Sequence, residues 1–248
     1  MYIGVQGRLV CPQPVDHGAV RGLCAALCGR YACLRSVMIG HSARGREIPA
    51  LVLPAAPAER RVLMVSAVDD RYRWTALYAL RLCEEMCACL RADLSLCGVP
   101  LSRALYGRQV WFVPLPDPDG QDLIYHSTAG QAEKQALPQK NGKIGDNALA
   151  QWCRRMDFRH AVVLGGGETS IGWEGGDATP PHSRLMAQVL SAVSGFPAAT
   201  LPEGADFARW FISTCRRPAL TLGLGSAEPP FDPFYANLRE MLLLSTLF

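Results

Sequence analysis

The sequence predicts an α/β fold with a mixed, mostly parallel central sheet and helices on both of its faces. Short apolar runs of the kind that form buried strands alternate with longer segments that carry apolar residues at helical spacing. Hydrophobic residues make up 49% of the 248 residues and charged residues 19%, which is ample for a core and argues against disorder. Because no internal repeat, low-complexity tract or convincing boundary interrupts this pattern, we expect one domain over residues 1–248.

The amino-terminal half supplies a helix, a hairpin, a buried strand and a long helix. An apolar pattern with a late glycine predicts a helix over 17–31. Residues 34–40 and 48–53 are strand-like and are joined by a polar, glycine-containing turn, which predicts a β-hairpin. The run VLMVSAV at 62–68 predicts a buried strand. Residues 74–90 carry apolar side chains at helical spacing, which predicts a long helix.

The carboxyl-terminal half continues the alternation. We expect a buried strand at 110–115, a tight turn with the sequence DPDG at 117–120, and a polar surface loop at 126–145. The other predicted helices are 147–156, 183–193, 207–215 and 237–247, and the other predicted strands are 161–164 and 220–224. These two strands, like 62–68 and 110–115, are short apolar runs, so we expect all four at the centre of the sheet.

Charge and cysteine content limit the expected partners. The formal net charge is only +3, and the arginines are scattered along the sequence without clustering with aromatic residues, so we expect no nucleic-acid partner. No apolar run reaches the roughly 18 residues that span a membrane, and no signal peptide is visible. Several of the ten cysteines fall in apolar helical patterns, where free cysteine packs as a small hydrophobic residue. We therefore expect a cytoplasmic protein without a membrane partner.

Five segments occur in an order that resembles the zinc carboxypeptidase family. They are IGHSARGREIPALVL, VLMVSAV followed by DDRYRWTALYAL, FVPLPDPDG, VVLGGGETSIGW, and GADFARWFISTCRRPALTLGLG. Together they cover most of residues 34–225, and they are most similar to the bacterial members that act on γ-D-glutamyl-diamino acid bonds of peptidoglycan peptides. The resemblance implies a carboxypeptidase-like fold and a zinc site at the ends of the matched strands.

This sequence differs from the family at the positions matched to its zinc ligands and catalytic residues. The resemblance puts Asp70, Arg73 and Leu164 where the family has its zinc ligands His, Glu and His. It puts Gly223 at the general base Glu and Leu201 at the tyrosine that closes over substrate. Zinc needs three donor side chains, and only one of the three matched residues is a donor. We therefore expect no cofactor, although zinc is the family's metal, and no catalytic residues.

A vestigial ligand-binding cleft is still expected, because ligands of open α/β sheets bind at the carboxyl ends of strands. Its predicted residues are Asp70, Arg73, Asp117, Leu164, Gly165, Glu168, Leu201 and Gly223. Several have structural alternatives. Glu168 would then cap a loop, and the glycines that begin at Gly165 would form a tight strand exit.

A further prediction concerns two residues that are matched to the zinc ligands. Asp70 and Arg73 have opposite charges and are three residues apart, so we expect their side chains to approach each other or share an anion, the alternative being an exposed pair at a helix start. On this interpretation, changing Asp70 to His, Arg73 to Glu and Leu164 to His together would restore metal binding. Hydrolysis would still be absent because Gly223 has no carboxylate.

The leading hypothesis from the sequence is a catalytically inactive carboxypeptidase-like protein that binds a peptide, a peptidoglycan fragment or a protein partner. One alternative is an active hydrolase whose metal ligands lie at other positions. A second alternative is a purely structural or assembly role. Fold does not fix function, so the ligand rests on analogy.

Overall fold

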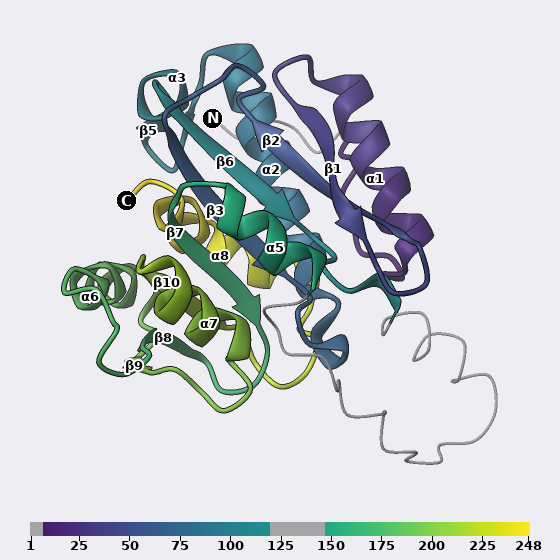
Figure 1. The fold of residues 1–248 in the computed structure, drawn as a ribbon. Coiled ribbons are helices and arrows are strands. Elements are labelled where there is room, and N and C mark those ends of the chain that lie inside the picture. The colour runs from purple at the N-terminus through teal and green to yellow at the C-terminus, as the bar shows by residue number, and fades with distance from the viewer. Residues whose placement is uncertain (1–6, 120–146) are drawn as a thin grey trace.

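The computed structural model describes residues 7–119 and 147–248, apart from the side chain of Asp70. The expected surface loop at 126–145 lies outside the described residues. Within them, eight strands form one sheet in the order β1-β2-β6-β3-β7-β10-β8-β9 (Figure 1). Their bounds are β1 Arg35–His41, β2 Glu47–Leu53, β3 Arg60–Ser66, β6 Arg108–Val113, β7 Phe158–Gly165, β8 Ser170–Glu174, β9 Ala198–Thr200 and β10 Ala219–Gly223.

Helices connect most of these strands. They are α1 His17–Arg30, the 3-10 turn η1 Asp70–Tyr72, α2 Thr75–Ala92, α3 Leu101–Ala104, α5 Ala148–Arg155, α6 Ser183–Ser194, α7 Asp206–Cys215 and α8 Phe231–Ser245. Two short strands, β4 Ser95–Leu96 and β5 Val99–Pro100, pair between α2 and α3. No helix among the described residues is both long and apolar enough to cross a membrane.

The centre of the sheet consists of the four strands that the sequence predicts there. Strands β6, β3, β7 and β10 are neighbours and all run parallel. On one side β2 joins β6 antiparallel and β1 joins β2 antiparallel. On the other side β8 pairs antiparallel with β10 and parallel with β9. The sheet is therefore mixed and mostly parallel, as predicted.

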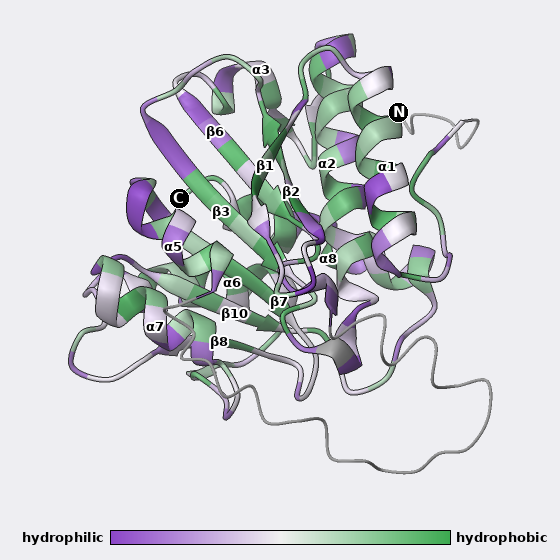
Figure 2. Cartoon of the chain, turned by 45° about the vertical axis from the view of Figure 1, so that its right-hand side comes forward, coloured by the Kyte–Doolittle hydropathy of each residue, from purple (hydrophilic) through white to green (hydrophobic). Residues whose placement is uncertain are grey.

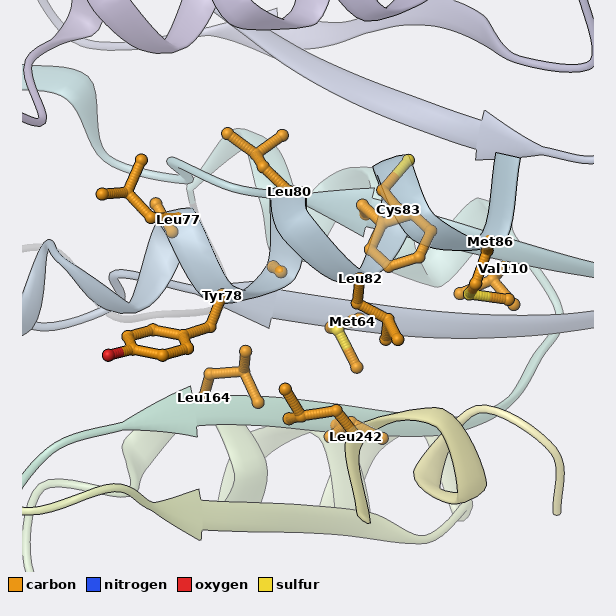
Figure 3. Close-up of a cluster of buried hydrophobic side chains, with 14 of the residues drawn as sticks. Met64, Leu77, Tyr78, Leu80, Leu82, Cys83, Met86, Val110, Leu164 and Leu242 are labelled. Atoms are coloured by element: carbon orange, nitrogen blue, oxygen red, sulfur yellow. The ribbon is translucent and has the colours of Figure 1, made fainter. Parts of the chain in front are cut away.

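Helices cover both faces of the sheet, which is also confirmed. Buried residues of α1, α2, α6 and α8 form one hydrophobic cluster with one face, and those of α5 and α7 form a second cluster with the other. Figure 3 shows part of the first cluster, in which Leu164 of β7 lies between Tyr78 of α2 and Leu242 of α8. Burial on both faces explains why the central strands are uninterrupted apolar runs.

Some elements differ from the prediction. Strands β8 and β9 and the short helix α3 were not predicted, because each is brief and lacks a long apolar run. Helix α8 begins at Phe231 and not near 237, so Pro233 lies in its first turn. Proline is tolerated there because the amide it lacks would have no partner within the helix.

Candidate functional site

The predicted site residues, with the exception of Leu201, lie at one edge of the sheet. Because β6, β3, β7 and β10 are parallel, their carboxyl ends lie together. Asp70 and Arg73 follow β3, Asp117 follows β6, Gly165 ends β7, Glu168 follows β7, and Gly223 ends β10. Gly165 and Gly223 are direct register partners. The shared edge is therefore observed, whereas a cleft that holds a ligand there remains a prediction.

The exit from β3 is organised by a charge pair other than the predicted one. Asp69 caps η1 by accepting a hydrogen bond from the backbone amide of Arg71 at 3.0 Å, and its carboxylate lies 2.6 Å from the Arg71 guanidinium. The hydrogen bond and charge of Asp69 raise the pKa of Arg71. The expected approach of Asp70 to Arg73 depends on a side chain outside the described ones, so it stays a prediction.

The backbones beyond β7 and β10 bond to each other where the resemblance implies a metal pocket. The amide of Leu224 donates to the carbonyl of Gly165 at 3.0 Å, and the amide of Gly167 donates to the carbonyl of Gly225 at 3.0 Å. The Ser226 hydroxyl donates to the carbonyl of Gly167 at 3.3 Å. The glycine run after β7 thus serves as a paired strand exit, which is the structural alternative that the sequence left open.

Two glycines at this edge leave no room for a side chain. A Cβ added to Gly223 would stand well inside 3.0 Å of the Glu168 carbonyl oxygen, a separation that real Cβ atoms essentially never show. A Cβ on Gly166 would overlap the ring of Tyr72. The position matched to the general base is therefore filled by main chain, and the ring of Tyr72 is packed against Gly166.

Two predicted cleft residues point elsewhere. Leu164 is fully buried in the hydrophobic cluster beneath α2, with Tyr78 and Met64 nearby (Figure 3). Leu201 is 3% exposed and lies in the cluster on the opposite face of the sheet. Their side chains do not line a common cleft, because they belong to clusters on opposite faces of the sheet. Glu168 is exposed in the loop after β7.

The turn after β6 binds the β1–β2 hairpin. Asp119 accepts hydrogen bonds from the Ser42 hydroxyl at 2.8 Å and from the Arg44 amide at 2.9 Å. Arg46 donates to the carbonyl of Pro118 at 3.0 Å. Asp117 accepts a hydrogen bond from the Asp119 amide at 3.3 Å, so it holds the turn, as the residue types predict. Two of the matched sequence segments are therefore in direct contact.

Tyr72 and Asp69 organise this edge, yet sequence reasoning did not single them out. Arg71 lies 5.3 Å over the ring of Tyr72, and the hydroxyl of Thr75 donates to the Tyr72 carbonyl at 2.8 Å. Thr75 also accepts the amide of Ala67 at 2.9 Å, which joins the end of β3 to the start of α2. The one sequence feature that could have indicated this contact is Gly166, because a residue without a side chain leaves space for the ring of Tyr72.

The residues at this edge do not fit a zinc ion. Among the side chains that the structure describes, no group of three or more His, Cys, Asp or Glu residues is placed to hold a metal. Of the positions matched to ligands, Leu164 is in the core and Arg73 is a cation. A hydrated zinc site needs three donors and an open position. No catalytic step through zinc is derived for these residues.

Solved metallocarboxypeptidases share this fold. The chain aligns over 94% of its length with a metallo-carboxypeptidase from Burkholderia cenocepacia, with TM-score 0.64, 14% identity and 68% of that chain covered. It aligns over 97% with thrombin-activatable fibrinolysis inhibitor, with TM-score 0.72, 11% identity and 76% of that chain covered. It aligns over 94% of its length with a metallo-carboxypeptidase from Pseudomonas aeruginosa, with TM-score 0.65, 17% identity and 68% of that chain covered. The chain therefore has the metallocarboxypeptidase fold.

A sequence match points in the same direction. The chain is 32% identical over 102 residues to γ-D-glutamyl-L-diamino acid endopeptidase 1 of Lysinibacillus sphaericus. The match covers 39% of this chain and about a quarter, 26%, of that protein. No family model matches the sequence. The predicted resemblance to zinc carboxypeptidases is confirmed by the structural and sequence relatives.

Proposed function

We propose that this protein is a catalytically inactive carboxypeptidase-like domain that binds a peptide with a γ-D-glutamyl-diamino acid linkage without cleaving it. The observation that carries the proposal is the contact between Gly223 and the carbonyl of Glu168, which leaves no room for a catalytic carboxylate at the matched position. The buried Leu164 supports it, because no donor is present at the third ligand position. Loss of both metal and base removes the two main contributions to peptide hydrolysis.

The ligand part of the proposal rests on the fold and on the relative from Lysinibacillus sphaericus, whose printed name specifies a γ-D-glutamyl-L-diamino acid substrate. Asp69, Arg71, Asp117 and Glu168 leave polar side chains at the edge where ligands of such sheets bind. Arginine pairs well with a carboxylate, and this peptide class carries several. The described cysteines are all free, which favours a cytoplasmic setting for the encounter.

Two measurements on the purified chain test the proposal. Elemental analysis after purification in zinc-containing buffer should find no bound zinc, and a γ-D-glutamyl-diaminopimelate tripeptide should remain intact on prolonged incubation. Titration calorimetry with the same tripeptide should show saturable binding, weakened by Glu168→Gln together with Arg71→Gln. A tripeptide with an α-linked glutamate serves as the matched control.

The results separate the alternatives. Stoichiometric zinc with tripeptide cleavage would establish the active-hydrolase alternative and end the proposal. Absence of zinc, cleavage and tripeptide binding would leave the structural or assembly role, in which the fold serves a protein partner.

A further inference from the structure

Arginines line the edge of the sheet opposite the candidate site. Because β3, β6 and β7 are parallel, their amino ends lie together there. β3 begins with Arg60 and Arg61, β6 begins with Arg108, and Arg159 is the second residue of β7. The register places Arg60 beside Arg108. In Figure 2 the amino ends of β3 and β6 are hydrophilic, whereas the rest of each strand is largely hydrophobic.

These arginines lack an acidic side-chain partner within the described part of the chain. None of the four arginines, nor Arg103 of α3, forms an ion pair with an Asp or Glu side chain among residues 7–119 and 147–248. Of the acidic residues next to them in sequence, Glu59 is exposed and in no described ion pair, and Asp157 lies 3.2 Å from Arg217. The edge therefore gathers five arginines that have no acidic side-chain partner in the described residues, although the whole chain has a formal net charge of only +3.

The arginines are close enough to affect one another. Burial lowers the pKa of Arg108, and the charges of Arg60 and Arg159 lower it further. Arg108 donates to the backbone oxygen of Phe248 at 2.8 Å, while its Nε is buried without a hydrogen-bond partner. Arg60 and Arg159 are exposed, so their guanidinium groups are available to an anion.

An aromatic ring stands among these charges. Tyr106 lies in the turn between α3 and β6 and is 87% exposed. Its amide donates to the carbonyl of Arg103 at 3.3 Å, and the next residue, Gly107, accepts the amide of Arg60 at 3.2 Å. The turn thus holds the ring between α3 and the first residues of β3. An exposed ring has no packing role there and offers a flat face to a ligand.

We propose that this edge binds single-stranded nucleic acid, with arginines on successive phosphates and Tyr106 stacked on a base. Arginine and aromatic side chains in this combination bind single strands with little sequence preference. Charge dominates the edge, whereas the centre of a protein interface is depleted in charge. A membrane surface would require apolar side chains that insert beside the cations. The inference is independent of the proposed peptidase-like role, and it runs against the expectation from the scattered arginines of the sequence.

Fluorescence anisotropy with a labelled oligothymidylate of about 20 nucleotides tests the proposal. We expect binding at low salt that weakens steeply as salt is raised, because bound cations are released from the phosphates. The variant Arg60→Glu/Arg159→Glu should bind roughly tenfold more weakly or worse, with a shallower salt dependence. Tyr106→Ala should weaken binding severalfold and leave the salt dependence unchanged.

The control variant Arg44→Glu, compared with the single variant Arg60→Glu, changes the net charge equally at the opposite edge and should bind as the unmodified protein does. Circular dichroism checks that all variants are folded. No binding at low salt, an equal loss in the control variant, or tighter binding of a labelled polyglutamate peptide than of the oligonucleotide would each overturn the proposal. The last outcome would assign the edge to an acidic protein.

Discussion

Single residues decide the chemistry of the candidate site. Gly223 ends β10 against the main chain of Glu168, and Leu164 of β7 points into the core. The resemblance matches these positions to the general base and the third zinc ligand of the carboxypeptidases, whereas a glycine and a leucine have no donor side chain. The packing leaves no space for a side chain at position 223 and buries the side chain at position 164. A single substitution at each position tests these two statements.

Gly223→Ala should destabilise the protein by about 2 kcal/mol or more, because the new Cβ must displace the backbone of Glu168. Gly165→Ala is the matched control. It is the register partner of Gly223, and its added Cβ would meet only the Thr221 methyl at 3.9 Å, an ordinary contact. Urea denaturation of the two variants measures the difference. Equal stability of both would show that the main chain at 168 yields easily.

Leu164→His should cost about 3 kcal/mol and should not create a metal ligand, because the imidazole would replace a leucine that is fully buried in the core. This revises the expectation that the triple change Asp70→His, Arg73→Glu, Leu164→His restores zinc. Leu164→Met conserves volume and should cost under about 1.5 kcal/mol. Zinc titration and urea denaturation of the variants check both statements, and tight zinc binding by the triple variant would contradict them.

Among elements, the contact between β7 and α8 carries a buried titratable group. His160 of β7 donates from its ring to the Ser245 carbonyl at the end of α8, with 2.7 Å between the atoms. Burial lowers the pKa of His160 from 6.5 to about 4, and the positive charges of Arg108, Arg159 and His182 act in the same direction, while the bond to Ser245 opposes them. The sheet and helix thus hold this imidazole neutral.

The stability of the protein should therefore fall as pH falls through this range. The unfolded chain takes up a proton on His160 near pH 6.5, whereas the folded chain does so only near pH 4. The neutral imidazole thus contributes stability above pH 6.5, and up to about 3 kcal/mol of it is lost by pH 4. His160→Gln keeps a donor without titrating. The difference in unfolding free energy between the two proteins, measured by urea at several pH values, should shrink on acidification, and a constant difference would refute the assignment.

At the scale of the whole molecule, two buried clusters lie on opposite faces of one sheet and share its strands. Such clusters should not unfold separately, since β2, β3, β6, β7 and β10 supply side chains to both. Trp74 belongs to one cluster, and Trp111 and Trp152 belong to the other. The prediction of one domain over 1–248 is therefore testable as cooperativity.

We expect thermal unfolding to be a single transition with the same midpoint by far-ultraviolet circular dichroism and by tryptophan fluorescence. Zinc or a chelator should leave the midpoint unchanged, because only a ligand that binds the folded state shifts it. Magnesium at the same concentration controls for general salt effects. Separate midpoints would contradict the single domain, and a rise specific to zinc would contradict the loss of the metal site.

The sequence determined the central strands and their flanking helices, because residues covered on both faces must be apolar and helical spacing is visible in the residue order. It also placed Asp70, Arg73, Asp117, Gly165, Glu168 and Gly223 at one edge, since parallel strands share their carboxyl ends. Brief strands such as β8 and β9 left too little pattern to predict.

Only the tertiary structure decided what these residues contact. Which face Leu164 presents, which backbone lies beside Gly223 and which ring packs on Gly166 depend on residues distant in sequence. The same holds for Arg60, Arg108 and Arg159, which are scattered along the chain but meet at one edge through strand pairing. The spacing of apolar residues in the sequence indicates which side of a single helix or strand is buried. Contacts between different elements form only when the sheet assembles, so that spacing does not predict them.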